Sequence, residues 1–577
     1  MPDRETVESA AISTREPTLK SAAWLFASAC LFALAFVPQL YGVTVWFALV
    51  PAFLAARTAR LSRLFWLAWA AGYVAMLAVF YWVMIVTWEG GLLLPIYLGL
   101  YWPVFFVAVE VLKRRLNVPR VVSAIALWPI LEFARGWLMT GLPWFYLGHA
   151  LYRWPRLIQS ADLGGALLVS AVVVFVNALL AEALAADASA PRRRFAVAAA
   201  AAVFAANLAY GVWRFARVSE TAGPTVALVQ PNVPQDIKIM QTDEDAARIF
   251  KDLRRMTLGD KARRADIIFW PETIMPGLVG VEDYVPARGL TNEERLDELS
   301  LQGLVTPAQR TEILRLCKSG VDFQTALERG GDPRLLPHLT AYSLLSSTSK
   351  IAGKPLVAGA IWAVVGPDGD HVERTYNRAY SFDASGREAA WYDKVHLVPF
   401  GEFIPFRDSL PAVSKFIGAM MPVRPVVYPG ADFEVFTVGP DKLGPAICFE
   451  DTFSYIGRQY RRRGVDILVN LTNDGWFGGS FELEAHLANA LFRAVETRMA
   501  VVRSANTGVS AVVSPKGVVV ARLADGRGRD REVEGLLVAN VPVSKTKTLY
   551  AALGDRWLFL PAALLAASVL VSRRRRC

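Results

Sequence analysis

Residues 443–471 read LGPAICFEDTFSYIGRQYRRRGVDILVNL, and this stretch decides the fold of the middle of the chain. It contains an apolar run at 443–449, a helical pattern that ends at Gly464, and a second apolar run at 465–471. Short continuous apolar runs are typical of strands that are buried on both faces of a sheet. Gly464 suits the end of a helix. The order strand, helix, strand predicts an α/β layered fold.

The same alternation extends over residues 214–548, which lack the long apolar runs found elsewhere in the chain. A second helical pattern occupies 483–498. Further strand-like runs are TVALVQ (225–230), ADIIFW (265–270), PLVAGAIWAVV (355–365) and MAVVRSA (499–505). Residues 285–350 interrupt this rhythm with a polar sequence rich in Glu, Arg and Leu. We therefore predict one α/β domain over 214–548 with a helical insertion or lid at 285–350.

The apolar residues concentrate towards the two ends of the chain. Of the 577 residues, 54% are hydrophobic and 20% are charged, and the mean hydropathy is +0.32. This balance indicates membrane-spanning and soluble parts in one protein. Eight apolar stretches approach the ~20 residues that a helix needs to cross the hydrocarbon core, and they predict an α-helical membrane bundle of eight transmembrane helices. They lie roughly at 21–39, 41–56, 64–87, 91–112, 121–139, 165–186, 195–213 and 549–571, as judged by window hydropathy.

Basic residues alternate between the loops of this predicted bundle. They follow every second stretch, as in the arginine runs 192–194 and 573–576, whereas the loops after the first and third stretches have almost none. The positive-inside rule then predicts that residues 1–20 and 572–577 are cytoplasmic tails and that 214–548 lies on the opposite face. The same loops account for the net charge of +10, so we expect no nucleic-acid partner.

Three strand-like runs end in reactive groups. Glu272 follows ADIIFW, Lys394 and Glu402 lie in DKVHLVPFGEFIP, and Cys448 ends LGPAIC. In α/β folds, functional groups gather at the carboxyl ends of strands. Cys448 also precedes a predicted helix, whose N-terminal dipole favours a thiolate. A thiol nucleophile, a carboxylate base and a cation for the oxyanion are the parts of an acyl-transfer site. Each group alone, however, is more typical of an ordinary structural role, as a buried thiol, a turn residue or a surface charge.

These three segments resemble the Glu-Lys-Cys triad of the nitrilase, or carbon–nitrogen hydrolase, superfamily. The resemblance is closest to one branch, the apolipoprotein N-acyltransferase family, and it covers most of the chain except the N-terminal tail and 285–350. The motifs that carry it are VQPNVPQDIK (229–238), WPET (270–273), DKVHLVPFGEFIP (393–405), ICFED (447–451), NLTNDGWFG (470–478) and SANTGVSAVVSPKG (504–517). The resemblance implies an αββα sandwich for the soluble domain. GLPW…LG and LIQSADLGG also resemble that family's outward loop between membrane helices.

The resemblance implies a role for each residue of the triad. Glu272 is similar to the family's general base, Lys394 to its oxyanion-stabilising cation, and Cys448 to its nucleophile. In the implied reaction, the thiol takes an acyl chain from a membrane phospholipid as a thioester. The α-amine of a diacylglyceryl-cysteine at the N-terminus of an apolipoprotein then accepts the chain. The implied location is the bacterial inner membrane, with residues 214–548 in the periplasm and the protein acting as a monomer.

Four further positions qualify the resemblance. Glu402 is similar to an additional active-site carboxylate, and Glu450 matches another acid implicated in function. The family often has Tyr after the nucleophile, where this chain has Phe449. It often has Trp after the Lys of the VPQ-x-x-K stretch, where this chain has Ile239. Phe449 keeps the aromatic ring and loses the hydroxyl, and we expect Ile239 to alter lipid contacts at its stretch. The triad itself is intact.

Two other functions share parts of this pattern. A membrane-tethered amidase or nitrilase has the same triad but uses water as the second nucleophile. A transporter with an inactive nitrilase-like domain has the same helices. The aromatic loop after the fifth apolar stretch and the eight predicted helices argue against the amidase, because an enzyme for a soluble substrate needs no membrane bundle. The five histidines show no pair at metal-ligand spacing, and there is no P-loop or dinucleotide motif. We therefore expect no metal and no cofactor.

Overall fold

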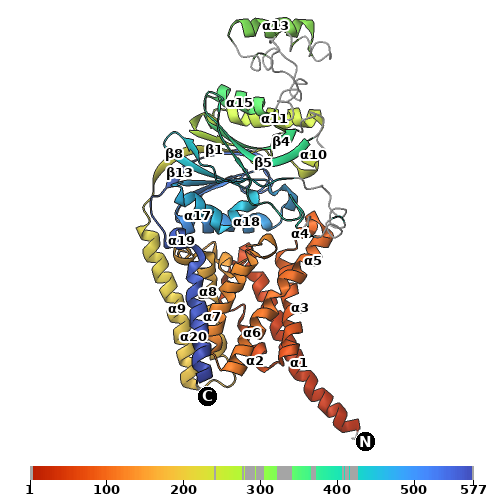
Figure 1. Ribbon diagram of the computed structural model, residues 1–577, viewed down its shortest axis with the longest axis vertical. Coiled ribbons are helices and arrows are strands. Elements are labelled where there is room, and N and C mark those ends of the chain that lie inside the picture. The colour runs from red at the N-terminus through yellow and green to blue at the C-terminus, as the bar shows by residue number, and fades with distance from the viewer. Residues whose placement is uncertain are drawn as a thin grey trace.

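The protein is described by a computed structural model with two layers of different character, a helical bundle and a pair of sheets above it (Figure 1). The described residues are 4–239, 242–275, 278–279, 305–320, 341–365, 372–405 and 427–574, with single residues at 293, 296, 326, 409 and 415. Helix α1 begins and helix α20 ends at the end of the bundle that lies away from the sheets (Figure 1). The two ends of the chain therefore lie on the same side of the bundle.

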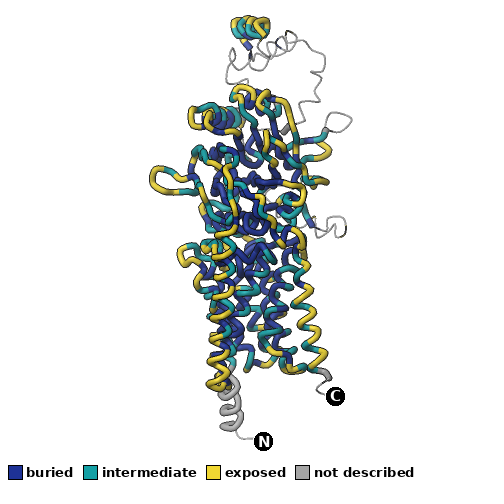
Figure 2. The backbone as a smooth tube through the Cα atoms, turned by 90° about the vertical axis from the view of Figure 1, so that its left-hand side faces the viewer, coloured by how far each residue is buried: buried dark blue, intermediate teal, exposed yellow. Residues whose placement is uncertain are grey.

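The bundle contains every apolar stretch that the sequence indicated, and each stretch forms helix. Its helices are α1 (Arg4–Ala35), α2 (Val50–Thr58), α3 (Leu61–Val79), α4 (Val83–Val86), α5 (Trp88–Gly99), α6 (Tyr101–Leu116), α7 (Arg120–Arg135), α8 (Ala161–Ala183), α9 (Ala190–Arg217), α19 (Leu549–Leu553) and α20 (Phe559–Arg574). Outer helices carry exposed apolar side chains, such as Trp66, Phe195 and Leu560. Figure 2 shows exposed residues along the outside of the bundle and buried ones inside it. Such an apolar outer surface suits contact with lipid chains, as expected for a multi-pass membrane protein.

The lengths of the helices bear on the predicted count of eight membrane spans. Within the described residues, six helical segments are long and apolar enough to cross a membrane. The second predicted stretch forms only a short apolar segment, Val43–Thr58. Helix α7, the fifth stretch, has 16 residues, which span about 24 Å at 1.5 Å per residue, and it carries Arg120, Glu132 and Arg135. The membrane bundle is thus supported, whereas the count of eight is not confirmed.

The soluble part is a sandwich of two sheets. In the described residues, a seven-stranded sheet has the order β13-β1-β2-β4-β5-β6 with β3 beside β4, and a six-stranded sheet has the order β12-β11-β10-β9-β8-β7. The strands are β1 (Thr221–Gln230), β2 (Ile267–Phe269), β3 (Leu278–Val279), β4 (Leu356–Val365), β5 (Val372–Phe382), β6 (Glu388–Asp393), β7 (Phe436–Val438), β8 (Asp441–Ile447), β9 (Ile467–Thr472), β10 (Ala500–Ala505), β11 (Ala511–Val513), β12 (Val519–Arg522) and β13 (Gly535–Val543). The αββα sandwich that the resemblance implied is confirmed.

Helices cover the two outer faces of the sandwich. Helices α11 (Asp243–Leu258) and α15 (Ala341–Ala352) pack their apolar side chains on the first sheet. Helices α17 (Ser454–Arg462) and α18 (Glu482–Thr497) cover the second sheet and lie between it and the bundle (Figure 1). A third apolar core fills the space between the two sheets, where alternate residues such as Val226, Leu228 and Val469 meet. The continuous apolar runs of the sequence are explained by burial on both strand faces.

The predicted insertion at 285–350 is described only in part. Helix α13 (Pro307–Lys318) begins with a capping box in which Thr306 and Gln309 bond each other's backbone N–H groups, a strong helix start signal. Helix α15, at the end of the predicted insertion, covers the first sheet. The remaining residues of the predicted insertion lie outside the described part of the chain.

Buried ion pairs join the bundle to the sandwich. Asp162, in the first turn of α8, accepts a hydrogen bond from Arg498 at 2.8 Å and pairs with Arg214 of α9. Tyr210 also donates to Asp162, at 2.6 Å. Arg498 is fully buried, so its charge depends on this carboxylate. Glu496 of α18 accepts from the backbone N–H of Ala166 in α8 at 2.9 Å.

Removing this carboxylate should destabilise the whole protein. Asp162→Ala leaves the buried Arg498 guanidinium without its anion, and an uncompensated buried charge costs about 3–5 kcal/mol. We expect a clear fall in the thermal unfolding temperature of the purified protein. Asp187→Ala removes an exposed carboxylate of the same bundle and should change that temperature little. Equal unfolding temperatures for both variants would contradict this role of Asp162.

Candidate active site

Three strand ends deliver the predicted triad to one place. Glu272 follows β2, Lys394 follows β6 directly, and Cys448 follows β8 directly. Strands β2 and β6 belong to one sheet and β8 belongs to the other. The site therefore lies between the two sheets, at the point where these strands end. Lys394 and Glu272 form an ion pair, and the charges of both act on the Cys448 thiol.

The Lys394 ammonium lies between two carboxylates. Its Nζ atom is 2.9 Å from Oε1 of Glu402 and 3.6 Å from Oε1 of Glu272. Lys394 is 1% exposed and Glu272 is 6% exposed. Burial alone lowers the pKa of Lys394, but Glu402 and then Glu272 outweigh it, so the pKa is raised above its usual value. Lys394 is therefore a permanent buried cation, as an oxyanion-stabilising group must be.

Asn377, in the middle of β5, connects the two carboxylates. Its Nδ2 atom donates to Glu272 at 2.7 Å and to Glu402 at 3.1 Å. The second oxygen of Glu272 accepts from the backbone N–H of Asn473 at 2.9 Å. The NDG residues 473–475 of the quoted motif NLTNDGWFG thus contribute backbone to the site. With donors on both of its oxygens, the Glu272 carboxylate is held in one orientation.

Cys448 has a strained backbone. Its φ is +52°, a left-handed conformation that non-glycine residues rarely adopt and that often occurs at functional sites. Two hydrogen bonds to the Cys448 carbonyl oxygen hold the backbone in this conformation. They come from Asn470 Nδ2 at 2.9 Å and from His486 Nε2 at 3.3 Å. This conformation turns the chain sharply between β8 and the 3₁₀ turn Cys448–Thr452.

The thiol is neutral at rest, contrary to the expectation that a helix dipole favours the thiolate. Burial, followed by the charge of Glu272, raises the pKa of Cys448 well above its usual value, and Lys394 opposes this only in part. The helix expected directly after Cys448 is a 3₁₀ turn of five residues, too short for a large dipole. The charge of Lys394 is already shared by two carboxylates. The thiol therefore needs a base that removes its proton as it reacts.

Glu450 joins the lysine segment to the cysteine segment. One of its oxygens accepts from Tyr392 at 2.7 Å and from the N–H groups of Val395 at 2.8 Å and His396 at 2.9 Å, and the other accepts from the N–H of Ile447 at 2.8 Å. Burial raises its pKa to about 7. Glu450 thus fixes the residues next to Lys394 against those next to Cys448, and it acts through them.

The other predicted site positions have distinct surroundings. Phe449 is buried and packs its ring edge-on against Phe453, at 5.0 Å between centroids. The side chain of Ile239 lies outside the described part of the molecule. Sequence reasoning gave no role to Asn377, which sits in a strand without a motif. The sequence analysis also gave no role to Lys238, although Lys238 is part of the motif VQPNVPQDIK. Its Nζ atom donates a hydrogen bond to Thr273 at 3.0 Å.

One buried cluster in the described residues could be considered for a metal ion. Polar atoms of Asp474, Glu482 and His486 lie within 4.8 Å of one another. The Arg503 guanidinium, however, is 2.6 Å from Asp474 and 2.7 Å from the His486 ring. Burial also raises the pKa of Glu482 well above its usual value. Arg503 already supplies the positive charge there, and the cluster supports the Cys448 carbonyl through His486.

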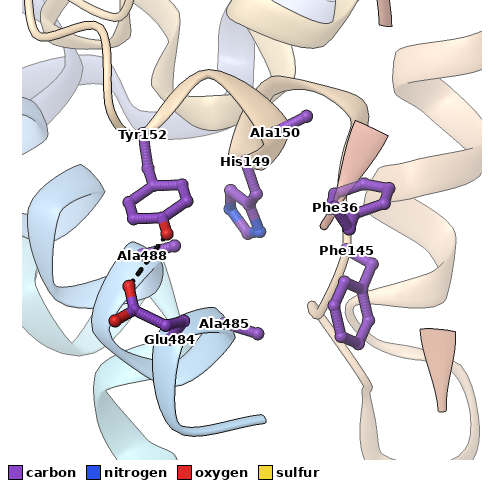
Figure 3. Close-up of a pocket in the computed structure, with 8 residues that line it drawn as sticks. All are labelled: Phe36, Phe145, His149, Ala150, Tyr152, Glu484, Ala485 and Ala488. Atoms are coloured by element: carbon purple, nitrogen blue, oxygen red, sulfur yellow. Dashed lines mark hydrogen bonds between the residues drawn. The ribbon is translucent and has the colours of Figure 1, made fainter. Parts of the chain in front are cut away.

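A small cavity lies where the bundle meets helix α18 (Figure 3). Phe36 and Phe145 form an apolar wall on one side, while Tyr152 and Glu484 face each other across the other side, joined by a hydrogen bond of 2.8 Å (Figure 3). His149 also lines the cavity. None of the predicted triad residues lines it, so this cavity is separate from the candidate active site.

Comparisons with known proteins agree with this architecture. The family model "Apolipoprotein N-acyltransferase N-terminal domain" matches residues 28–179, and the model "Carbon-nitrogen hydrolase" matches 225–550. An apolipoprotein N-acyltransferase of Geobacter metallireducens is 29% identical, covering 95% of this chain and 94% of that protein. One from Bradyrhizobium diazoefficiens is 32% identical, covering 84% of this chain and 78% of its own. The crystal structure of an amidase from Nesterenkonia sp. is 19% identical over 61% of this chain and 98% of its own, with a TM-score of 0.29.

Replacing Glu450 by its amide should damage the site. In Glu450→Gln, the new NH₂ group must face a donor, because all four hydrogen bonds to Glu450 come from N–H or O–H groups. A mispaired buried donor costs about 1–3 kcal/mol, so we expect turnover to fall about 5- to 150-fold. The exposed Glu434→Gln serves as the control. Full turnover in Glu450→Gln, measured beside this control, would show that Glu450 does not hold the site together.

Proposed function

This chain belongs to the apolipoprotein N-acyltransferase family, and we propose that its Cys448 carries an acyl chain as a thioester between two membrane-anchored substrates. Membership makes the protein a multi-pass membrane N-acyltransferase of lipoprotein biosynthesis, with lipid and lipoprotein substrates. The proposal adds the residues and the order of steps. The convergence of Glu272, Lys394 and Cys448 from two sheets is the observation that carries it.

In the first half-reaction, Glu272 takes the proton from the Cys448 thiol as sulfur attacks the ester carbonyl of a membrane phospholipid. The carbonyl oxygen becomes an oxyanion, which the Lys394 ammonium and a backbone amide near Phe449 stabilise. The C–O bond then breaks, and the leaving lysophospholipid oxygen receives the proton from Glu272. The neutral resting thiol supports this order, because deprotonation has to accompany attack.

In the second half-reaction, the α-amine of a diacylglyceryl-cysteine attacks the thioester carbonyl. Lys394 stabilises the oxyanion that forms on the thioester oxygen, and Glu272 removes a proton from the attacking nitrogen. The C–S bond then breaks, and the Cys448 sulfur receives that proton from Glu272. An amide forms and the free thiol returns, which is ping-pong chemistry. Glu402 and Asn377 hold Lys394 and Glu272 in place throughout. They position the reacting groups and do not exchange protons in this scheme.

We also propose that the protein works as a monomer in the bacterial inner membrane with the sandwich in the periplasm. The arginine runs 192–194 and 573–576 support this orientation through the positive-inside rule. Helix α20 ends and α1 begins at the end of the bundle remote from the sandwich (Figure 1). Both chain ends are then cytoplasmic.

The nucleophile can be tested by mass spectrometry of the intact protein. After exposure to phospholipid without acceptor, we expect one acyl adduct on Cys448, and the adduct should disappear when a lipopeptide with a free N-terminal amine is added. Cys448→Ala should form no adduct, whereas Cys30→Ala, which removes an exposed thiol of α1, should form it normally. An adduct in Cys448→Ala, or release of free fatty acid without any amide product, would contradict the proposal.

The orientation can be tested by labelling single cysteines in cells. Gly526 lies in an open loop of the sandwich with no heavy atom within 4 Å of the added Cβ position, and Ala186 is exposed between α8 and α9. In a background without the natural cysteines, a membrane-impermeant maleimide added from the periplasmic side should label Gly526→Cys and not Ala186→Cys. The reverse pattern would place the sandwich in the cytoplasm.

A further inference from the structure

A second lysine faces the candidate active site. Helix α10 (Gln235–Ile239) holds Lys238 beside the β2 end, where its Nζ donates to the Thr273 hydroxyl at 3.0 Å. Thr273 directly follows Glu272 and has a left-handed φ of +43°. The Lys238 ammonium also interacts electrostatically with Glu272 and with Cys448. Lys238 therefore contacts the residue that follows Glu272, and the reaction scheme above gives it no task.

The segment that carries Lys238 is fixed to the site. Asn506 donates to the Val233 carbonyl at 2.8 Å and accepts from the Val233 N–H at 2.9 Å. Two residues further on, the Gln235 side chain accepts from Asn473 at 3.0 Å, and the backbone N–H of Asn473 binds Glu272. These bonds tie α10 to the loops that orient the base. Lys238 is thus held in place and is only half-exposed.

The two lysines differ in what surrounds them. Lys394 is fully buried between two carboxylates. Among the described residues, the hydrogen-bond partner of the Lys238 ammonium is a neutral hydroxyl. Glu272, Glu402 and Lys394 together carry a net charge of −1 when the thiol is neutral, and a protonated Lys238 brings the site to zero. Without it, any anionic substrate group would meet a negative site.

From this arrangement we infer that Lys238 binds the phosphodiester of the acyl donor while Cys448 attacks the donor's ester. The inference rests on the proposed function. In a glycerophospholipid only the glycerol separates the ester from the phosphate, so both groups fit beside neighbouring side chains. An ammonium–phosphate hydrogen bond is charge-assisted and strengthens where water is partly excluded. Lys238 is then a specificity-determining residue, which selects phospholipids over uncharged esters.

The inference is tested by comparing two acyl donors. The rate of the Cys448 acyl adduct is measured by mass spectrometry with a phosphatidylethanolamine and with p-nitrophenyl palmitate, which has no phosphate. In Lys238→Met, we expect the phospholipid rate to fall at least 10-fold and the p-nitrophenyl rate to change less than about 2-fold, in line with the loss of one charge-assisted hydrogen bond. Lys238→Arg should recover most of the phospholipid rate, and Lys251→Met, an exposed lysine of α11, should change neither rate.

The pH profile gives a second readout. Burial lowers the pKa of Lys238 to about 8, and the charge of Glu272 opposes this only in part. The ammonium is present below this pH and lost above it. The ratio of the phospholipid rate to the p-nitrophenyl rate should therefore fall as pH rises through about 8, and it should stay level in Lys238→Arg. Taking the ratio removes the titration of Cys448, which acts on both donors.

Two results would overturn the inference. Equal losses with both donors in Lys238→Met would mean that Lys238 serves the oxyanion, the base or the fold, and not the phosphate. An unchanged phospholipid rate would mean that it has no part in donor binding. The p-nitrophenyl donor reports separately on the thiol chemistry. If the proposed function is wrong, the protein with its natural sequence should form no acyl adduct on Cys448 with either donor.

Discussion

The whole site depends on burying the Lys394 ammonium between Glu272 and Glu402. Moving an ammonium out of water costs several kcal/mol, and here two carboxylates at 2.9 and 3.6 Å compensate for that loss. The Glu272 and Glu402 carboxylates must in addition be oriented towards the same Lys394 ammonium. Asn377 meets that need from β5, and the N–H of Asn473 meets it from the opposite sheet. The two sheets must therefore be packed together before the base and the cation exist as a unit.

The second constraint is the bilayer, in which both substrates are anchored. A catalyst for such substrates has to keep its nucleophile at the membrane surface, and this explains a sandwich that sits directly on a helical bundle. Helix α18 lies at that junction and supplies polar contacts on several sides, through Glu484 to Tyr152 and through Glu496 to Ala166. The same helix carries His486, which bonds the Cys448 carbonyl. The proposed nucleophile is thus positioned by an element that also contacts the membrane part.

The positions of the strands and of the triad could be predicted from the sequence, because strands buried on both faces appear as continuous apolar runs. The apolar runs that end before Glu272, Lys394 and Cys448 predicted strands, and their common end predicted a site. Residues that act through geometry left no such pattern: Asn377 stands alone in a strand, and Asn473 contributes a backbone N–H. The raised pKa of Cys448 could not be predicted, since it depends on burial and on the charges around the thiol, which only the fold defines. The predicted count of eight spans stays unconfirmed for a related reason, because apolar composition does not fix where a helix ends.

The central claim is that an acyl group on Cys448 places its carbonyl oxygen against the Lys394 ammonium. A structure of the protein frozen after reaction with phospholipid, without acceptor, tests it most directly. We expect continuous density from the Cys448 sulfur, with the thioester oxygen about 3 Å from Lys394 Nζ, as required of a group that stabilises an oxyanion. Density for the acyl group on another side chain, or a thioester oxygen that points away from Lys394, would contradict it.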